Sequence, residues 1–335
     1  MQFQRFHLIL ATLLLGSAFC VSAQDIQERT IKFGHLNNAD HPVSFGVKRF
    51  GELVLAKSGG KIKVQEFPSS TLGNELQQQS ALQGGIQEMS APATTSLAGI
   101  VKEFGLVDFP FSVATFAQAD ALLDGPLGQA LIETLPAKGL VALGYWDLGF
   151  RNVTNSKRPI TKPEDLEGLK IRVIPNPVFL DTFRAFKANP LPMPFSELYN
   201  ALESKAVDGQ ENPFAVIQSN KFYEVQKYVS ATNHVYAANI VLVSKRFWDK
   251  LSATEKKIMN DAANETRGYQ RQVSRAAAQK AVGELQTKGM QYNELSAAEQ
   301  GRMRQIAKPV TDRFMSTYDP AIVKLYTTEL ARIQK

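Results

Sequence analysis

Short apolar strands alternate with helical segments along most of the chain, and this alternation constrains its fold more than any other feature. Strand patterns at residues 31–34 and 61–67 flank a helical pattern at 44–57 that stops at Gly59 and Gly60. Helical patterns follow Gly73 and span 116–123, with strands predicted near 88–91 and at 139–145. Strands separated by helices predict an α/β fold with parallel pairing.

A second unit begins near Phe150. Residues 161–164 have the pattern of a helix N-terminus, and a strand at 169–174 ends at Pro175 and Pro177, which exclude continued strand pairing. We then expect a helix at 177–186, a strand at 190–193, a helix capped by Ser196, a short segment at 207–210 and a strand at 239–244.

Residues 252–288 are almost continuously helical, which corresponds to a rod of about 50 Å. Such a helix is longer than one small lobe. Two interpretations are open: a pair of helices broken at Asn264 or Gly268, or one rigid strut lying across two lobes. A second helix start is predicted at Ser296, with Glu299 three residues later.

The first residues predict a secretory signal peptide. Arg5 is followed by the apolar stretch 8–15 and the small-residue segment 21–23, so we expect cleavage after Ala23 and a periplasmic location. The apolar stretch is about half of the ~20 residues that a membrane-spanning helix needs. A lipid anchor on Cys20 is disfavoured because the bulky Phe19 precedes it.

Cleavage there removes the only cysteine and one arginine. The remaining 312 residues carry 37 Lys and Arg against 32 Asp and Glu, a net charge of +5. Without cysteine, disulfides, thiol nucleophiles and thiolate metal sites are excluded. The basic residues are scattered rather than clustered with aromatics, which argues against nucleic acid as a partner and weakly favours an anionic ligand.

Enzyme signatures are mostly missing. The chain has no phosphate-binding loop, no His-Glu-x-x-His, no Gly-x-Gly-x-x-Gly and no Gly-x-Ser-x-Gly. His35 and His41 lie six residues apart with no third soft ligand near them, so we expect no metal ion, and no cofactor is predicted.

Two arginines lie at positions that a purely structural role explains poorly. Arg172 lies inside the apolar strand 171–174, and Arg151 lies at the junction of the two units. An arginine on a partly buried sheet face needs a partner, which could be internal, such as Glu203 or Asp208. However, ligands of open α/β sheets bind at the carboxyl ends of strands, and a guanidinium fork matches a carboxylate.

The polar turn 207–213 and several other segments resemble the solute-binding proteins of tripartite ATP-independent periplasmic (TRAP) transporters. The matching segments are FPSSTLG at 67–73, GYW at 144–146, FR at 150–151, GLKIRV at 168–173, PMPFSELY at 192–199, VDGQENP at 207–213 and KFYEVQK at 221–227. They occur in order over most of the chain, and the 207–213 segment together with the arginine strand is highly specific.

The resemblance implies a two-lobed, periplasmic-binding-protein-like α/β fold with a long helix that braces both lobes. Residues 24–149 and about 238–278 would form the first lobe. Residues 150–237 and about 279–335 would form the second. Such a receptor closes around an organic acid and delivers it to the membrane subunits of the transporter. We expect it to act as a monomer.

The resemblance also assigns roles to individual residues. Arg172 matches the arginine that forms a bidentate pair with the ligand carboxylate, and Arg151 and Asn212 match residues that also hold it. Phe195 matches an aromatic wall, and Asn176 falls on a loop that lines the pocket. On the other lobe, Glu75 falls where a polar group contacts the distal part of the ligand, with loop 35–41 and segment 91–95 completing that side.

The polar residues of the distal side favour a sugar acid. Segment 90–95 has only small residues where sialic-acid receptors carry a glutamate, while segments 145–146, 153–156 and 189–195 resemble the sugar-acid branch. Several side chains could bind hydroxyl groups: Asn37, Asn38, His41, Glu75 and Asn239. A uronate, such as glucuronate or galacturonate, or an aldonate is therefore expected.

Three alternatives remain. A C4-dicarboxylate would need a second cation opposite Arg172, which only the histidines, Lys48 or Arg49 could supply. A periplasmic enzyme acting on the same acids would depend on His41 and Glu75, the only plausible acid–base pair. A ligand sensor that docks to a membrane kinase would use the same fold.

Overall fold

The computed structural model describes residues 26–334, and the signal peptide predicted at residues 1–23 lies outside them. Nine strands form one mixed sheet in the order β2-β1-β3-β8-β4-β7-β5-β6, with β9 also paired to β8. The strands are β1 Arg29–Gly34, β2 Ile62–Phe67, β3 Met89–Ser90, β4 Leu140–Asn155, β5 Lys170–Val173, β6 Asn189–Pro192, β7 Gly209–Pro213, β8 Tyr228–Ser244 and β9 Gln291–Glu294.

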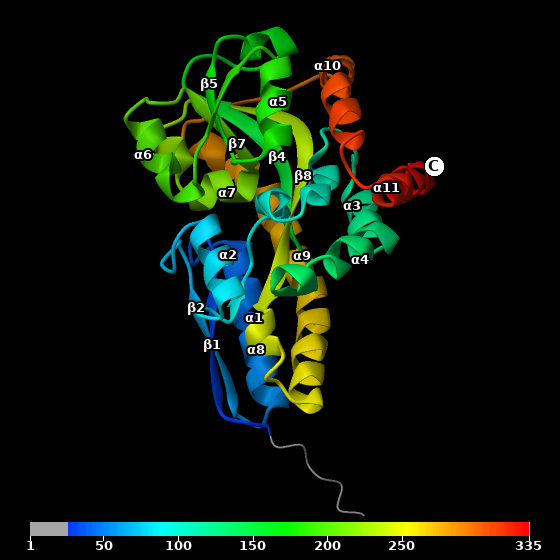
Figure 1. Ribbon diagram of the computed structural model, residues 1–335. Helices are drawn as coiled ribbons and strands as arrows, with labels where there is room; N and C mark the ends of the chain where they lie inside the picture. The colour runs from blue at the N-terminus through cyan, green and yellow to red at the C-terminus, as the bar shows by residue number, and fades with distance from the viewer. Residues whose placement is uncertain (1–25, 335) are drawn as a thin grey trace, which may run out of the picture.

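Figure 1 shows two lobes, one built around β1, β2 and α1 and the other around β5, β7 and α5. The helices are α1 Pro42–Lys57, α2 Glu75–Gly84, α3 Phe116–Leu123, α4 Pro126–Glu133, α5 Pro177–Ala185, α6 Leu198–Glu203, α7 Phe214–Ser219, α8 Lys245–Trp248, α9 Ala253–Thr287, α10 Ala297–Met315 and α11 Pro320–Ile333. The predicted α/β, two-lobed architecture is confirmed. Within residues 26–334, no helix is both long enough and apolar enough to cross a bilayer.

Two long strands connect the lobes. β4 and β8 pair in antiparallel fashion from Leu140 opposite Ser244 to Asn155 opposite Tyr228. The sequence predicted only their first-lobe ends, at 139–145 and 239–244. Their other halves escaped prediction because they carry buried polar side chains, including those of Arg151, Thr154 and His234, which break the apolar pattern.

The predicted parallel pairing is correct for the short strands that pair with one another and wrong where the long strands meet β3, β7 and each other. β1 pairs in parallel with β2 and β3, and β5 pairs in parallel with β6 and β7. β3 pairs with β8, and β4 pairs with both β7 and β8, in antiparallel fashion, whereas β9 pairs with β8 in parallel. Long connecting strands thus replace a flexible linker.

The helix α9 is a single unbroken element of 35 residues, which decides between the two interpretations of this segment. Its N-terminus is a capping box, in which the Ser252 side chain accepts from the Glu255 N–H and Glu255 accepts from the Ser252 N–H. It packs against α1, β4 and α7. Because β4 enters both lobes and α7 belongs to the second, α9 is the strut.

Two predicted helix starts are displaced. Residues 161–164 lead only into the single 3-10 turn η4, Pro163–Leu166, and the segment after Ser196 forms the turn η5, Phe195–Glu197, before α6 begins at Leu198. In both places the chain reaches a new strand or helix within a few residues, so a longer helix has no room.

Each lobe has its own apolar core. Phe33, Phe50 and Trp146 belong to the first-lobe core, and Ile171, Phe179 and Phe183 to the second. A further core beside the first lobe includes Leu127, Leu242 and Tyr326. The last helix, α11, packs on α3 and α4 in that core. The assignment of residues 279–335 to the second lobe remains a prediction.

Gly268 tests the continuity of α9. It is exposed in the middle of the helix, and a Cβ there would meet no atom within 4 Å. Gly268→Ala is expected to raise the free energy of unfolding by roughly 0.5–1 kcal/mol, because alanine loses less backbone entropy. Urea unfolding followed by circular dichroism measures this change.

The matched control is Gly149→Ala. Gly149 has φ +124°, and its added Cβ would lie 3.2 Å from the Pro213 Cβ, so this variant is expected to be less stable. A destabilised Gly268→Ala would contradict an unbroken helix.

Candidate ligand-binding site

A cavity lies between the two lobes, where β4, β5, β7 and β8 meet the loops of the first lobe. The space between its lining atoms is about 450 Å³, including solvent at its mouth. The lining residues are Leu36, Asn37, Glu75, Ala91, Ala93, Ser96, Leu148, Arg151, Arg172, Ile174, Phe195, Asn212, Val216 and Asn239. Its lining combines two arginines, a carboxylate and amides with apolar side chains, a mixture found in sites for small polar ligands.

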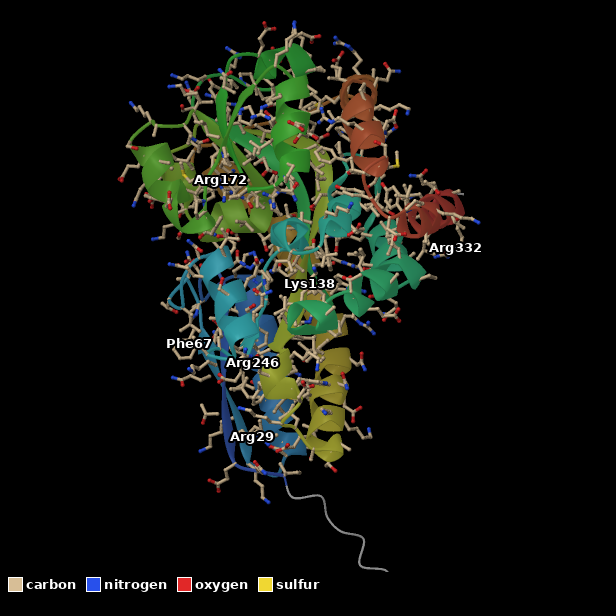
Figure 2. All side chains as sticks on the ribbon, viewed as in Figure 1. Arg29, Phe67, Lys138, Arg172, Arg246 and Arg332 are labelled. Atoms are coloured by element: carbon tan, nitrogen blue, oxygen red, sulfur yellow. The ribbon has the colours of Figure 1, made fainter. Side chains whose placement is uncertain are left out.

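Arg172 on β5, labelled in Figure 2, is fully buried and belongs to the lining of this cavity. Its Nε and Nη2 atoms donate to the Met193 carbonyl oxygen at 2.9 and 2.6 Å, and its guanidinium carbon lies 5.9 Å from the centre of the Phe195 ring. Its Nη1 has no hydrogen-bond partner, and no carboxylate among residues 26–334 forms an ion pair with it. Burial lowers the pKa of Arg172 to about 10, so it stays charged at neutral pH.

Arg151 on β4 is also fully buried, and its internal partner is Glu211 on β7. Its Nε lies 2.5 Å from Glu211 Oε2, and its Nη2 donates to Oε1 at 2.8 Å and to the Glu211 carbonyl at 2.7 Å. The Nη1 atom is again without a partner. Neither Glu203 nor Asp208, the internal partners considered from the sequence, pairs with either arginine within the described residues.

Glu211 is held by a second group behind the cavity. His234 Nε2 lies 3.1 Å from Glu211 Oε2, and His234 Nδ1 lies 2.8 Å from the Thr232 hydroxyl. Burial alone would raise the pKa of the Glu211 carboxyl, but the charge of Arg151 and the His234 hydrogen bond outweigh it and hold the pKa below its ordinary value. Glu211 therefore remains a carboxylate and fixes the orientation of Arg151.

Asn212 and Asn239 line the cavity from β7 and β8 and differ in how far their amides are paired. Asn212 donates through Nδ2 to Gln210 Oε1 at 2.5 Å. Asn239 donates through Nδ2 to the Ala91 carbonyl at 2.6 Å, and its Oδ1 is buried without a partner. Three residues of the lining therefore carry a polar atom with no partner in the described protein: Nη1 of Arg151, Nη1 of Arg172 and Oδ1 of Asn239.

Glu75 lines the cavity from the first lobe. It is the first residue of α2, which Asn74 caps, and it is 8% exposed. Its Oε1 accepts a hydrogen bond from the Phe195 N–H of the second lobe at 3.2 Å. The carboxylate thus joins the two lobes at the wall of the cavity.

Three predicted site residues lie outside the lining. Asn176 caps α5, accepting from the Val178 N–H, and donates to the Thr95 carbonyl and Asp108 Oδ2. His41 caps α1, and burial, followed by the charge of His35, lowers its pKa to about 3. Asn38 lies at the outer mouth, where it donates to the Ser219 carbonyl across the lobes. These three polar residues were expected to face a ligand. Their side chains instead cap a helix or form a contact between the lobes.

Four lining residues were not predicted from the sequence: Ser96, Leu148, Ile174 and Val216. Three of them are apolar and look like ordinary core residues. Among the four, only Ile174 could have been assigned to the cavity from the sequence, because it follows the arginine strand directly. Within residues 26–334, there is no group of three or more His, Cys, Asp or Glu side chains that could hold a metal ion.

The comparison with known proteins decides the family. Residues 33–317 match the family model of the bacterial extracellular solute-binding proteins, family 7. The chain belongs to this family of TRAP receptors. It is 35% identical over 279 residues to the 2,3-diketo-L-gulonate-binding periplasmic protein YiaO of Escherichia coli, covering 83% of this chain and 85% of that protein.

Two solved family 7 structures illustrate the ligands of relatives. The sugar acid binding protein DctPAm from Advenella mimigardefordensis, in complex with galactonate, superposes with a TM-score of 0.90 at 39% identity, over 92% of this chain and 100% of that one. A TRAP solute binding protein from Sulfurospirillum deleyianum with bound succinate has a TM-score of 0.85 at 30% identity, over 90% and 99%. Family 7 members are substrate-binding receptors.

The pair of Arg151 and Glu211 can be tested through stability. Glu211→Gln is expected to lower the free energy of unfolding by roughly 3–5 kcal/mol, because it leaves a buried guanidinium without its counter-charge. Urea unfolding measures this loss, and Glu203→Gln, at an exposed position of α6, is the control.

The pH dependence gives a second readout. A carboxyl whose pKa is lowered in the folded state stabilises the protein above the unfolded pKa of about 4.3, and this contribution disappears as the pH falls through the folded pKa. The difference in the free energy of unfolding between wild type and Glu211→Gln is therefore expected to shrink below about pH 4. A constant difference would contradict the ionised pair.

Proposed function

We propose that this protein is the periplasmic receptor for a sugar acid, an aldonate or a uronate such as glucuronate or galacturonate, which it delivers to the membrane subunits of a TRAP transporter. The observation that carries the proposal is the set of unpaired buried polar atoms in the cavity. Arg172 Nη1 and Arg151 Nη1 are donors without acceptors, and Asn239 Oδ1 is an acceptor without a donor. A carboxylate and a hydroxyl group would satisfy them together.

The roles of individual residues follow from this assignment. Arg172, Arg151 and Asn212 hold the carboxylate, and Phe195 packs against the ligand beside Arg172. Glu75 and Asn239 bind hydroxyl groups at the other end. Asn38, Asn176 and His41 stabilise the helices and the contacts between the lobes and do not contact the ligand directly. Secretion through residues 1–23 and a monomeric state remain part of the proposal.

Glu75 favours a sugar acid over a dicarboxylate. Its carboxylate accepts hydrogen bonds from hydroxyl groups and repels a second anionic group. Lys48 is no counter-charge for a second carboxylate, because it lies outside the lining and near Glu66, at 3.8 Å. The relatives that bind galactonate and 2,3-diketo-L-gulonate support this choice, while the succinate-bound relative keeps the dicarboxylate as the second candidate.

The enzyme hypothesis finds no support in the arrangement of its two residues. Glu75 faces the cavity, but His41 caps α1 outside the lining and has a pKa lowered to about 3 by burial. An imidazole with that pKa is uncharged near neutral pH and is a weak base, so it does not supply the acid of an acid–base pair. Incubation with uronates followed by NMR tests for turnover, and any product would refute a pure receptor.

The bidentate role of Arg172 predicts that Arg172→Lys binds an acid far more weakly than wild type does. One ammonium cannot replace two parallel donors, and the loss for a buried charged pair is about 2–5 kcal/mol. Isothermal titration calorimetry with galactonate measures it. Arg184→Lys, at an exposed position of α5, is the control.

An Arg172→Lys variant within about threefold of wild type would exclude the bidentate role. Arg151→Ala is expected to weaken binding less than Arg172→Ala does, because Arg151 is already partly used by Glu211.

The choice of ligand is tested by a thermal-shift screen of sugar acids and dicarboxylates, followed by calorimetry. A ligand at 100 times its dissociation constant stabilises the folded protein by ~2.7 kcal/mol. We expect a uronate or aldonate to bind at least about a hundredfold more tightly than succinate, because each buried hydroxyl partner left unpaired costs about 1–3 kcal/mol.

Glu75→Gln is expected to reduce the difference in affinity between a sugar acid and succinate, because it removes the repulsion of a second carboxylate. Glu52→Gln, on the exposed side of α1, leaves this difference unchanged. If succinate or malate matched or exceeded every sugar acid, the dicarboxylate assignment would replace this one.

A further inference from the structure

The strand β4 is irregular where it passes between the lobes. Its register with β8 shifts between Asp147 and Gly149, and Gly149 has φ +124°. On its other edge, β4 pairs with β7 only from Arg151 to Asn155. The peptide of Asp147 therefore has no neighbouring strand on that edge, just before the cavity residues Leu148 and Arg151.

A side chain of α9 takes the place of the missing strand. The Asp147 N–H donates to Gln270 Oε1 at 2.8 Å, and Gln270 Nε2 donates to the Asp147 carbonyl at 2.8 Å. Gln270 is fully buried. A primary amide has both a donor and an acceptor, so it can pair with a peptide group at two points as a strand does. The strut α9 is thereby bonded to the backbone of β4.

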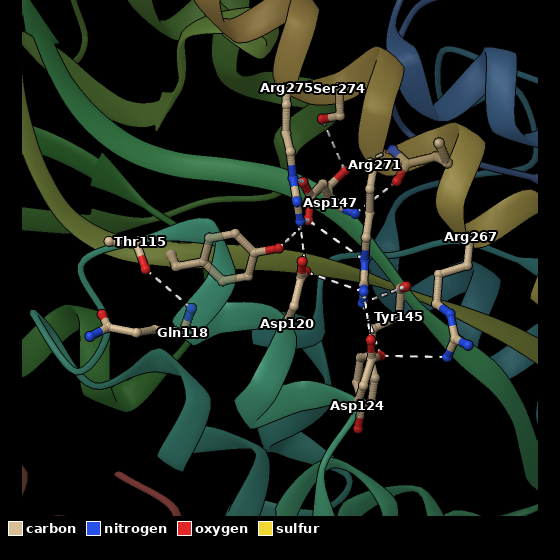
Figure 3. Close-up of polar contacts among 12 residues, drawn as sticks. Thr115, Gln118, Asp120, Asp124, Tyr145, Asp147, Arg267, Arg271, Ser274 and Arg275 are labelled. Carbon is tan, nitrogen blue, oxygen red and sulfur yellow. Dashed lines mark hydrogen bonds and ion pairs between the residues drawn. The ribbon is translucent and has the colours of Figure 1, made fainter. Parts of the chain in front are cut away.

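The Asp147 side chain strengthens the same junction (Figure 3). Its Oδ2 accepts from Arg275 Nε at 2.6 Å, and its Oδ1 accepts from the Tyr236 hydroxyl. Arg275 also donates to Asp120 Oδ1 on α3 at 2.6 Å, and its guanidinium carbon lies 4.8 Å from the centre of the Phe116 ring. Asp147 thus joins α9, β8 and, through Arg275, α3.

The contacts on either side of this junction differ. Arg271, one turn before Arg275, forms two hydrogen bonds with Asp124, at 2.6 and 3.0 Å, on the first-lobe side. Arg267, a further turn away, reaches Asp124 only at 3.5 Å, and both side chains of that pair are about one-third exposed. Gln270, Ser274 and Arg275 form hydrogen bonds with Asp147, at the start of the segment that enters the cavity, whereas Arg271 Nε lies 4.0 Å from Asp147 Oδ1.

We propose that Gln270 and Arg275 are positioning residues for ligand binding. By fixing Asp147 to α9 they set the path of β4 from Asp147 to Arg151, and this path places Leu148 and Arg151 in the cavity and fixes how the lobes meet. Neither residue lines the cavity. The inference rests on the receptor class and not on the choice of sugar acid.

The test uses residues 24–335, which contain no cysteine, with spin labels on Gln65→Cys and Asn200→Cys. These positions are exposed on β2 and α6, on opposite lobes (Figure 1). Gln270→Met keeps the side-chain length and removes both hydrogen bonds. We expect it to widen the distribution of distances between the lobes without ligand and to raise the dissociation constant for galactonate about tenfold. Arg267→Gln is the matched control and is expected to change neither.

A purely structural role would give a different result. Gln270→Met would then lower the melting temperature but leave the distance distribution and the dissociation constant as in the control, and this outcome would overturn the proposal. If wild type does not bind galactonate, the sugar-acid assignment loses support, and the ligand-free distances alone decide the positioning role. Should Gln270→Met fail to fold, Gln270→Glu, which keeps the acceptor and loses the donor, is expected to widen the distribution less, and no change would refute the proposal.

Discussion

The structure depends on two buried arginines between the lobes, each of which has one guanidinium nitrogen, Nη1, without a partner in the described protein. Taking a guanidinium out of water is costly unless its hydrogen bonds and its charge are satisfied. Arg172 satisfies two of its nitrogen atoms with one carbonyl, and Arg151 satisfies two with the Glu211 carboxylate and carbonyl. Arg172 has no ion-pair partner within the described chain, and in the function proposed above the carboxylate of the ligand supplies this counter-charge.

The fold holds these groups in place with strands rather than loops. Arg172 lies on β5, Arg151 on β4 and Glu211 on β7, and adjacent strands of one sheet have little freedom to move apart. Side-chain hydrogen bonds then join this sheet to the first lobe. Glu75 accepts from the Phe195 N–H, Asn38 donates to the Ser219 carbonyl, and Asn176 donates to the Thr95 carbonyl.

The sequence predicted the elements that have a strong local signal. The arginine strand, the helix predicted at 177–186 and the helical character of 252–288 were anticipated, because caps, prolines and periodicity are local properties, whereas the continuity of α9 was left open. The full lengths of β4 and β8 were not, since their second-lobe halves carry buried polar residues whose partners are far away in the chain. Glu211, for example, is 60 residues from Arg151.

The cavity was only partly predictable for a related reason. Polar residues at the ends of helices and strands can bind a ligand or cap an element, and the two roles need the same side chains. Asn176 and His41 cap helices, whereas Asn239 keeps a free oxygen in the cavity. Only the positions of residues distant in sequence separate these cases. The apolar wall from Leu148 and Val216 had no distinguishing pattern at all.

A crystal structure of the protein with galactonate tests the central claim most directly. The account predicts the carboxylate within hydrogen-bond distance of Nη1 of both Arg172 and Arg151, with a ligand hydroxyl donating to Asn239 Oδ1. A bound acid whose carboxylate lies elsewhere, with both Nη1 atoms still unpaired, would contradict it.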